Sequence, residues 1–241
     1  MKYKKIKEAI FLSRPNRFIA YAIVDGERTV VHVKNTGRCK ELLREGAVVY
    51  LEDYEGDIRK RKTRYSLVAV EKKENTGKSG IRLVNMDSLA PNKVVGEALL
   101  NGSIFLPGFE GGLTLIKPES TFGDSRFDFY IEGNQGSKAY IEVKGATLED
   151  MDVARFPDAP TERGVKHINE LCNTIEQGFL AYIIFVIQMK DILYFEPNDE
   201  MHLAFGQALR IAKEKGVSIL AYDCKVTKSS MKINKPVPIR L

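Results

Sequence analysis

The first third of the chain alternates between apolar and polar residues in short runs that are separated by turn signals. We predict strands at residues 18–24, 29–33, 47–51 and 65–70, because these runs have the period-2 pattern of half-buried strands. Asp25-Gly26 predicts a hairpin turn, Asn35-Thr-Gly37 a second turn, and residues 39–44 a short helix. Four or five strands with one short helix in roughly 70 residues are typical of a small barrel such as the OB-fold.

After residue 82 the pattern changes to helices that alternate with strands. The 3.6-residue period predicts helices at 92–101, 161–178 and 200–215, and strands are predicted at 113–116, 127–131, 139–143, 181–187 and 217–222. Such alternation indicates an α/β/α sandwich around a mixed sheet. We therefore predict an α/β (α+β) fold with two domains, an OB-fold barrel at residues 1–82 and the sandwich at 83–241. Residues 74–80 are predicted to be an exposed loop near the boundary.

Charge divides the chain in nearly the same place. Residues 1–80 carry a net charge of +8 and residues 81–241 a net charge of −3, within a total of +5. A basic module joined to a slightly acidic one suggests a polyanion-binding domain attached to a domain that uses carboxylates.

The basic module also has the residue types of a nucleic-acid groove. Arginines alternate with tyrosines and phenylalanines, and the run 59–64 is strongly basic. OB-like barrels bind strands by combining a cationic groove with base stacking. The arginines that we select as candidate DNA contacts are Arg14, Arg17, Arg38 and Arg64. The alternative is that the aromatic residues form the barrel core and the basic run is a solvated loop.

The composition argues against a membrane or secreted protein. The longest apolar run, residues 180–187, is too short to span a bilayer. Three widely spaced cysteines, Cys39, Cys172 and Cys224, indicate neither a disulfide framework nor a zinc site. We expect a cytoplasmic protein with no membrane partner, and the sequence leaves room for a homo-oligomer.

The clearest chemistry lies on the two predicted strands at 127–131 and 139–143. Alternation puts Asp128 on the face opposite its apolar neighbours, Phe127, Phe129 and Ile131. On the second strand and its end, Glu142 and Lys144 share a face. Two carboxylates and an ammonium group are thus expected to point into one space. The alternative is an ordinary solvated strand face, because an Asp…Glu-x-Lys pattern is short.

This trio has the groups that phosphodiester hydrolysis needs. Carboxylate oxygens can hold Mg²⁺ or Mn²⁺, which activates water and neutralises charge on the phosphate. A neighbouring lysine can orient the water or stabilise the transition state. We expect Asp128, Glu142 and the carbonyl of Val143 to bind the metal, with Glu97 on the preceding helix as a further candidate ligand.

The predicted helix at 161–178 adds a polar stripe that follows helical spacing. Arg163, Lys166 and His167 are candidate phosphate contacts, and Glu170 is a candidate catalytic residue that supports the metal or the water. Thr161 is expected to cap the helix. The alternative is a solvated helix face, in which His167 is only a surface residue.

Several motifs together resemble a known family. The matching stretches are Arg14-Pro-Asn-Arg-Phe18, Asn35-Thr-Gly-Arg38, Arg61-Lys-Thr-Arg64, Pro91-Asn92, Ser125-Arg-Phe-Asp-Phe129, Glu142-Val-Lys144, Phe156-Pro-Asp-Ala-Pro-Thr161 and Arg163-Gly-Val-Lys-His167. In this order they resemble the sugar fermentation stimulation protein A family of bacteria and archaea. The resemblance implies an N-terminal OB-fold, a C-terminal PD-(D/E)XK nuclease-like domain, DNA binding and a regulatory connection to sugar metabolism.

Our hypothesis is a DNA-binding protein that cleaves phosphodiester bonds with Mg²⁺ or Mn²⁺. Asp128, Glu142, Lys144 and Glu170 would act in catalysis, while Arg126, Arg163, Lys166 and His167 would hold phosphates. The main alternative is a DNA-binding transcriptional regulator of sugar metabolism that no longer cuts. A third is a carbohydrate-binding protein, because OB-folds also bind oligosaccharides.

Overall fold

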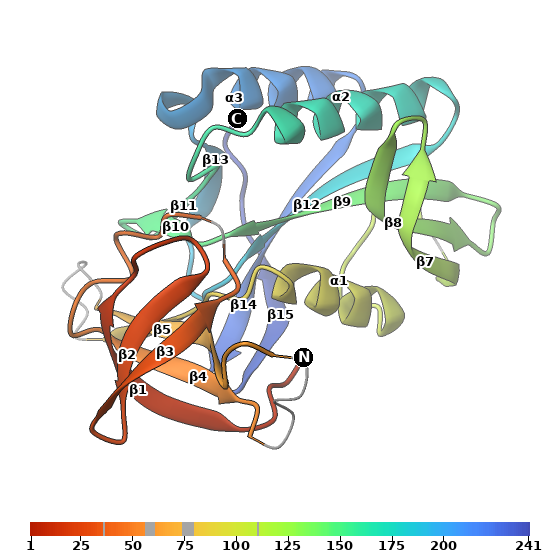
Figure 1. Ribbon diagram of the computed structural model, residues 1–241. Helices are drawn as coiled ribbons and strands as arrows, with labels where there is room; N and C mark the ends of the chain where they lie inside the picture. The colour runs from red at the N-terminus through yellow and green to blue at the C-terminus, as the bar shows by residue number, and fades with distance from the viewer. Residues whose placement is uncertain (36, 56–60, 74–79, 110) are drawn as a thin grey trace.

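The computed structural model describes residues 1–35, 37–55, 61–73, 80–109 and 111–241 (Figure 1). Arg59 and Lys60 of the basic run, and residues 74–79 of the predicted loop, lie outside the described residues. Within the described part of the chain, no helix is both long and apolar enough to cross a lipid bilayer.

The N-terminal domain is a closed barrel. Its strands are β1 (Ile6–Ser13), β2 (Ile19–Val24), β3 (Glu27–Val33), β4 (Val48–Asp53) and β5 (Tyr65–Lys73), with β6 (Ile81–Asn85) added beside β5. Antiparallel pairs join β3 to β2, β2 to β1, β1 to β4 and β4 to β5. A parallel pairing of β3 with β5 closes the circle. This topology confirms the OB-fold, and β6 carries the sheet past residue 82.

Two details of the barrel differ from the sequence prediction. β1 is absent from the predicted strands because its sequence, IKEAIFLS, does not alternate regularly between apolar and polar residues: Ala9 and Phe11 are buried, whereas Ile10 is exposed. The predicted helix at 39–44 is wrong, since this segment forms hydrogen-bonded turns around Cys39, which has a φ of 45°. So short a segment gains little from helix formation, whose first turn is costly, and burial of Cys39 and Leu42 decides its shape instead.

The C-terminal domain has a six-stranded mixed sheet with helices on both faces (Figure 1). The strand order is β15 (Ser230–Pro236), β14 (Ser218–Thr227), β12 (Leu180–Ile187), β9 (Lys138–Ala146), β8 (Ser125–Gly133) and β7 (Leu113–Phe122). The central strands β9, β12 and β14 are parallel to one another. Helices α2 (Glu162–Glu176) and α3 (Asp199–Glu214) cover one face, and α1 (Ala90–Leu100) packs on the other.

A small second sheet extends this domain toward the barrel. It consists of β10 (Leu148–Asp150), β11 (Val153–Phe156) and β13 (Tyr194–Pro197). The most regular predictions are confirmed: Ala181–Ile187 is buried throughout in β12, and the Thr161 side chain caps α2 by accepting a hydrogen bond from the Gly164 amide at 3.0 Å.

The predicted alternation fails at one important place, Asp128. Phe127 packs in the apolar cluster under α2, whereas Phe129 and Ile131 pack in the cluster under α1. β8 pairs with β9 only from Phe129 to Glu132, although its pairing with β7 includes Phe127, Arg126 and Ser125, so the edge of β8 that faces β9 is unpaired at Asp128. Asp128 therefore stands in a gap between β8 and β9.

Polar side chains hold the barrel against the second domain. Lys34 of the barrel forms ion pairs with Asp87 at 3.0 Å and with Glu52 at 3.5 Å. The Gln188 amide at the end of β12 donates to the Asn85 carbonyl at 3.0 Å. Buried groups with this many partners fix the domain orientation, and they bring the barrel loop around Asn35 to the ends of β9 and β12.

Candidate active site

Asp128 bridges β8, β9 and α1. One oxygen, Oδ2, accepts the backbone N–H of Val143 at 2.7 Å, and Oδ1 accepts from the Asn92 amide at 2.5 Å. The side chain replaces the β8 backbone that would otherwise pair with Val143. Burial, and next the nearby charge of Glu142, raise the pKa of Asp128 above its ordinary value.

Glu142 on β9 is the most enclosed acid of the trio, with 3% of its surface exposed. Its Oε1 accepts two hydrogen bonds, from Lys144 Nζ at 2.5 Å and from His167 Nδ1 at 2.6 Å. Its Oε2 is buried and has no hydrogen-bond partner within the described residues. Burial opposes ionisation, but the His167 hydrogen bond and the Lys144 charge outweigh it, so the pKa of Glu142 is lowered.

His167 supports Glu142 from the helix that covers the sheet. Arg163 Nε donates to His167 Nε2 at 3.4 Å, one helical turn away, which leaves Nδ1–H to donate to Glu142. The histidine is 7% exposed. Its predicted role as a phosphate contact is therefore wrong, because both ring nitrogens are used inside the protein. The sequence signal for a buried His167 was its position one helical turn after Arg163, on the face of α2 that meets β9.

The carboxylate oxygens of Asp128 and Glu142 are the kind of ligand that a hard metal ion prefers. The orphaned Oε2 of Glu142 is a buried anionic oxygen that lacks the partner such atoms normally have. The N–H and C=O of one strand residue point to the same side, so the Val143 carbonyl faces the gap that holds Asp128. Among the described residues, no group of three or more His, Cys, Asp or Glu side chains is arranged to hold a metal ion, so the protein would offer two acids and one carbonyl, and water would complete the ligand set.

Glu97 does not belong to this set. Its carboxylate forms an ion pair with the N-terminal amino group of Met1 at 2.6 Å. The α1 residue that reaches Asp128 is Asn92. Five positions along a helix correspond to a rotation of about 140° from the first side chain, which turns Glu97 away. The structure thus places Glu97 beside Met1 and not beside Asp128.

Other predicted residues lie around the trio rather than within it. Arg126 is exposed on β8, two residues before Asp128, and its guanidinium lies 3.6 Å from Glu119. Arg163 and Lys166 are exposed on α2. Glu170, one turn beyond His167, faces the β7–β8 turn: its Oε2 lies 3.7 Å from where a Cβ on Gly123 would stand. These residues make no direct contact with the trio that would test their proposed roles.

The four barrel arginines have different environments. Arg14 donates to the backbone carbonyls of residues 17, 35, 37 and 38, at 2.5 to 3.0 Å. Arg64 makes two 2.8 Å bonds to Asp53. Arg14 is therefore a structural tie for the loop, and Arg64 is paired with a carboxylate while its side chain stays partly exposed. Arg17 and Arg38 are exposed and line a cleft of about 700 Å³.

The architecture is that of an OB-fold barrel followed by a restriction-endonuclease-like α/β/α domain. Comparison with known proteins then identifies the family. Residues 12–78 match the SfsA N-terminal OB domain, and residues 89–230 match the sugar fermentation stimulation protein RE domain. The chain belongs to the sugar fermentation stimulation protein family.

Relatives match the chain along its whole length. The sugar fermentation stimulation protein homolog of Ruminiclostridium cellulolyticum is 53% identical, and that of Clostridium beijerinckii 51%, each over 100% of both chains. Among solved structures, Pyrococcus furiosus SfsA in complex with Ca²⁺ is 26% identical, with a TM-score of 0.84 over 100% of this chain and 98% of that one. These matches support both the recognised family and the two-domain fold.

Proposed function

We propose that this protein is a metal-dependent nuclease that acts on DNA. The observation that carries the proposal is the Glu142 carboxylate, which is fixed by two donors on one oxygen and has the other oxygen buried without a partner beside Asp128. A carboxylate held in this way is preorganised to bind a cation with its free oxygen.

The metal in question is Mg²⁺ or Mn²⁺, and when bound it would lower the pKa of a water molecule and neutralise phosphate charge. Asp128, Glu142 Oε2 and the Val143 carbonyl would hold it. The Lys144 ammonium group would orient the attacking water and stabilise charge on the phosphate. His167 and Arg163 hold the Glu142 carboxylate in place, while Arg126, Lys166 and Glu170 remain proposed contributors at the rim.

Two further points support a bound cation. The Pyrococcus furiosus relative was solved in complex with Ca²⁺, a hard cation that takes oxygen ligands. In the present chain, the proximity of Glu142 raises the pKa of Asp128 after the effect of burial. Two acids that disfavour each other's ionisation in this way gain from a shared divalent cation.

The second candidate function is a DNA-binding regulator of sugar metabolism that does not cut. Two carboxylates without a third acid within the described residues form a sparse metal site, which favours this alternative. The exposed Arg17 and Arg38 beside a large cleft would serve a binding protein equally well.

Cleavage of labelled single- and double-stranded DNA and RNA distinguishes the two functions. Wild-type protein should cut DNA with Mg²⁺ or Mn²⁺ and not with EDTA, and Lys144→Ala should lower the rate at least about 100-fold, as for loss of a preorganised transition-state group. Lys138→Ala is the matched control, because Lys138 lies on the same strand but is exposed. Tight binding without cleavage under either metal would reject the nuclease and support the regulator.

A further inference from the structure

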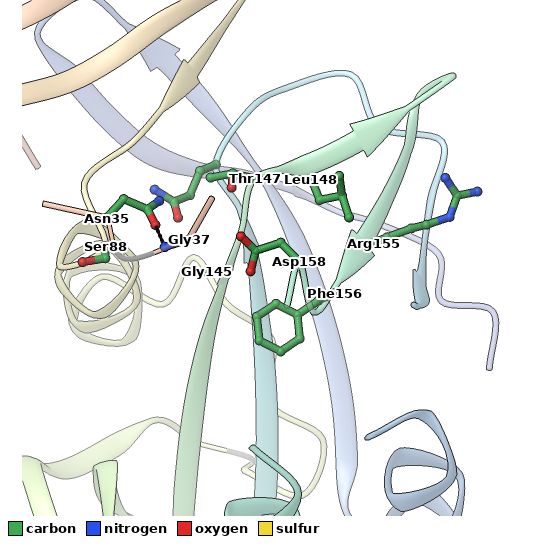
Figure 2. Close-up of a pocket in the computed structure, with 10 residues that line it drawn as sticks. Asn35, Gly37, Ser88, Gly145, Thr147, Leu148, Arg155, Phe156 and Asp158 are labelled. Atoms are coloured by element: carbon green, nitrogen blue, oxygen red, sulfur yellow. Dashed lines mark hydrogen bonds between the residues drawn. The ribbon is translucent and has the colours of Figure 1, made fainter. Parts of the chain in front are cut away.

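A separate polar pocket lies at the junction of the two domains, directly beyond the trio. Its volume is about 190 Å³, and Gly145, the residue after Lys144, forms part of its wall. The barrel contributes Asn35 and Gly37, and the second domain contributes Asp158 (Figure 2). Gln188 of the second domain also lines the pocket. At about 30 Å³ per water molecule the pocket has room for roughly six waters, which corresponds to one heterocyclic base and not to a base pair.

Gln188 presents a hydrogen-bond acceptor to this pocket. Its Nε2 donates to the Asn85 carbonyl at 3.0 Å, to Asn85 Oδ1 at 3.1 Å and to the Asp87 carbonyl at 3.2 Å. These bonds fix the amide so that Oε1 points at Gly145, where an added Cβ would approach it to 2.6 Å. Gln188 as a residue is 2% exposed, and no group of the described residues donates a hydrogen bond to its Oε1. Oε1 is not among the fully buried atoms that lack a partner, so this acceptor is open to the pocket and can take a donor from a ligand.

Asp158 supplies the second acceptor and the only carboxylate in the pocket lining. Figure 2 shows its carboxylate turned toward Gly37, and a Cβ on Gly37 would collide with Asp158 Oδ2. Across the part of the chain that the structure describes, Asp158 has neither an ion-pair nor a hydrogen-bond partner. Arg155, also in the lining, is engaged with Glu196 at 2.7 Å. The pocket is therefore rich in acceptors and carries an uncompensated negative charge.

The acceptors and the negative charge of this pocket favour a ligand with adjacent hydrogen-bond donors. A phosphate group would be repelled by Asp158, whereas adjacent N–H donors would satisfy both carboxylate oxygens. Among the four DNA bases, guanine alone has two neighbouring donors on its Watson–Crick edge, N1–H and N2–H₂. Phe156 also lines the pocket, and its ring packs against Phe185 and Phe205 in the core, which fixes this part of the wall.

We propose that the junction pocket binds one unpaired guanine base of a nucleic-acid strand whose backbone lies at the trio. The proposal rests on the proposed function for the presence of the strand. Because a pocket of this volume takes one base and not a base pair, the substrate has an unpaired guanine, either in a single strand or extruded from a duplex. The pocket gives the protein a base preference next to its site of chemistry.

The test is fluorescence anisotropy with nine-nucleotide oligothymidylate strands that carry one central guanine, hypoxanthine, adenine or thymine. The assay is run in EDTA, where a metal-dependent nuclease cannot cut. Hypoxanthine lacks only the N2 amino group, so we expect the wild type to bind the guanine strand about tenfold more tightly, as for one bond to a charged acceptor. Asp158→Asn should abolish this preference, and Asp150→Asn, an exposed control on the neighbouring strand β10, should keep it.

Each other outcome overturns the pocket proposal. Equal binding of all strands, binding of none, or an unchanged guanine preference in Asp158→Asn would do so. Loss of Ca²⁺ affinity in Asp158→Asn without any base preference would show a cation site instead. A guanine preference without cleavage would reject the nuclease function and support the guanine pocket, so the experiment distinguishes failure of one proposal from failure of the other.

Discussion

Replacement of Asp128 by asparagine should make the metal-free protein more stable while removing its response to metal. The Val143 N–H can still donate to the amide oxygen of the new side chain, which takes the place of Oδ2. Asn92, on the surface, can turn its amide so that its own oxygen accepts from the new NH₂ group. The substitution therefore keeps both hydrogen bonds and removes one buried negative charge beside Glu142.

The direction follows from the raised pKa of Asp128. A carboxyl group whose pKa is higher in the folded state contributes stability below its unfolded pKa, and this contribution is lost as the pH rises through the folded value. At neutral pH the ionised Asp128 is therefore a cost to the metal-free fold. Each unit of pKa shift corresponds to about 1.4 kcal/mol, and each kcal/mol of added stability raises the Tm of a chain of this size by roughly 2–4 °C, so we expect Asp128→Asn to have the higher Tm at neutral pH.

Thermal unfolding in EDTA at several pH values measures this effect. Wild type and Asp128→Asn should have equal Tm below the ordinary aspartate pKa of 3.8, where both side chains are neutral, and should diverge as the pH rises. Added Mn²⁺ at about 100 times its Kd should stabilise the wild type by about 2.7 kcal/mol and should leave the variant unchanged. Asp124→Asn, on the exposed β7–β8 turn, is the matched control and should change neither quantity. A variant that is less stable than wild type in EDTA, or that gains equally from Mn²⁺, would refute the reasoning.

Two further predictions concern positioning and binding. Asparagine at position 167 places an amide N–H near the original Nδ1, so His167→Asn should retain most of the cleavage rate and the Mn²⁺ affinity. His167→Gln, whose amide lies near Nε2, should lose about tenfold in both, because it holds Glu142 more weakly. If the two variants lose cleavage rate and Mn²⁺ affinity to the same extent, this reasoning is contradicted. Arg38→Ala should weaken DNA binding several-fold and reduce its salt dependence in anisotropy titrations, while Arg64→Ala should have little effect because Asp53 already neutralises that arginine. A larger effect at Arg64 would show that the barrel binds on another face.

Local sequence pattern was sufficient for much of the fold. The period-2 runs predicted four of the barrel strands, β2 to β5, and the strand pair that carries the trio, and the uniformly apolar run predicted the buried strand β12. The threonine before α2 predicted its cap. These features follow from how side chains repeat along one element, so they depend on neighbours in sequence. The ordered motifs similarly identified the family, which whole-chain relatives confirm.

The details of the site depended on contacts between distant parts of the chain. Asp128 lies at an unpaired edge of β8 because pairing with β9 begins only at Phe129. The partner of Asp128 on α1 is Asn92 rather than Glu97, because the rotation of the helix against the sheet decides which side chain arrives. His167 became a buried support for Glu142 because α2 covers this face of β9.

The family and the identity of the trio were thus determined by the amino-acid sequence itself. Only the tertiary structure decided that one oxygen of Glu142 is left free, that Arg14 is a structural tie, and that two domains enclose an acceptor-lined pocket beyond Lys144. The physical reason is that the sequence pattern reports whether a position is apolar or polar. Which polar groups become hydrogen-bond or ion-pair partners depends on strand register, helix rotation and domain docking, and these are set by packing over the whole chain.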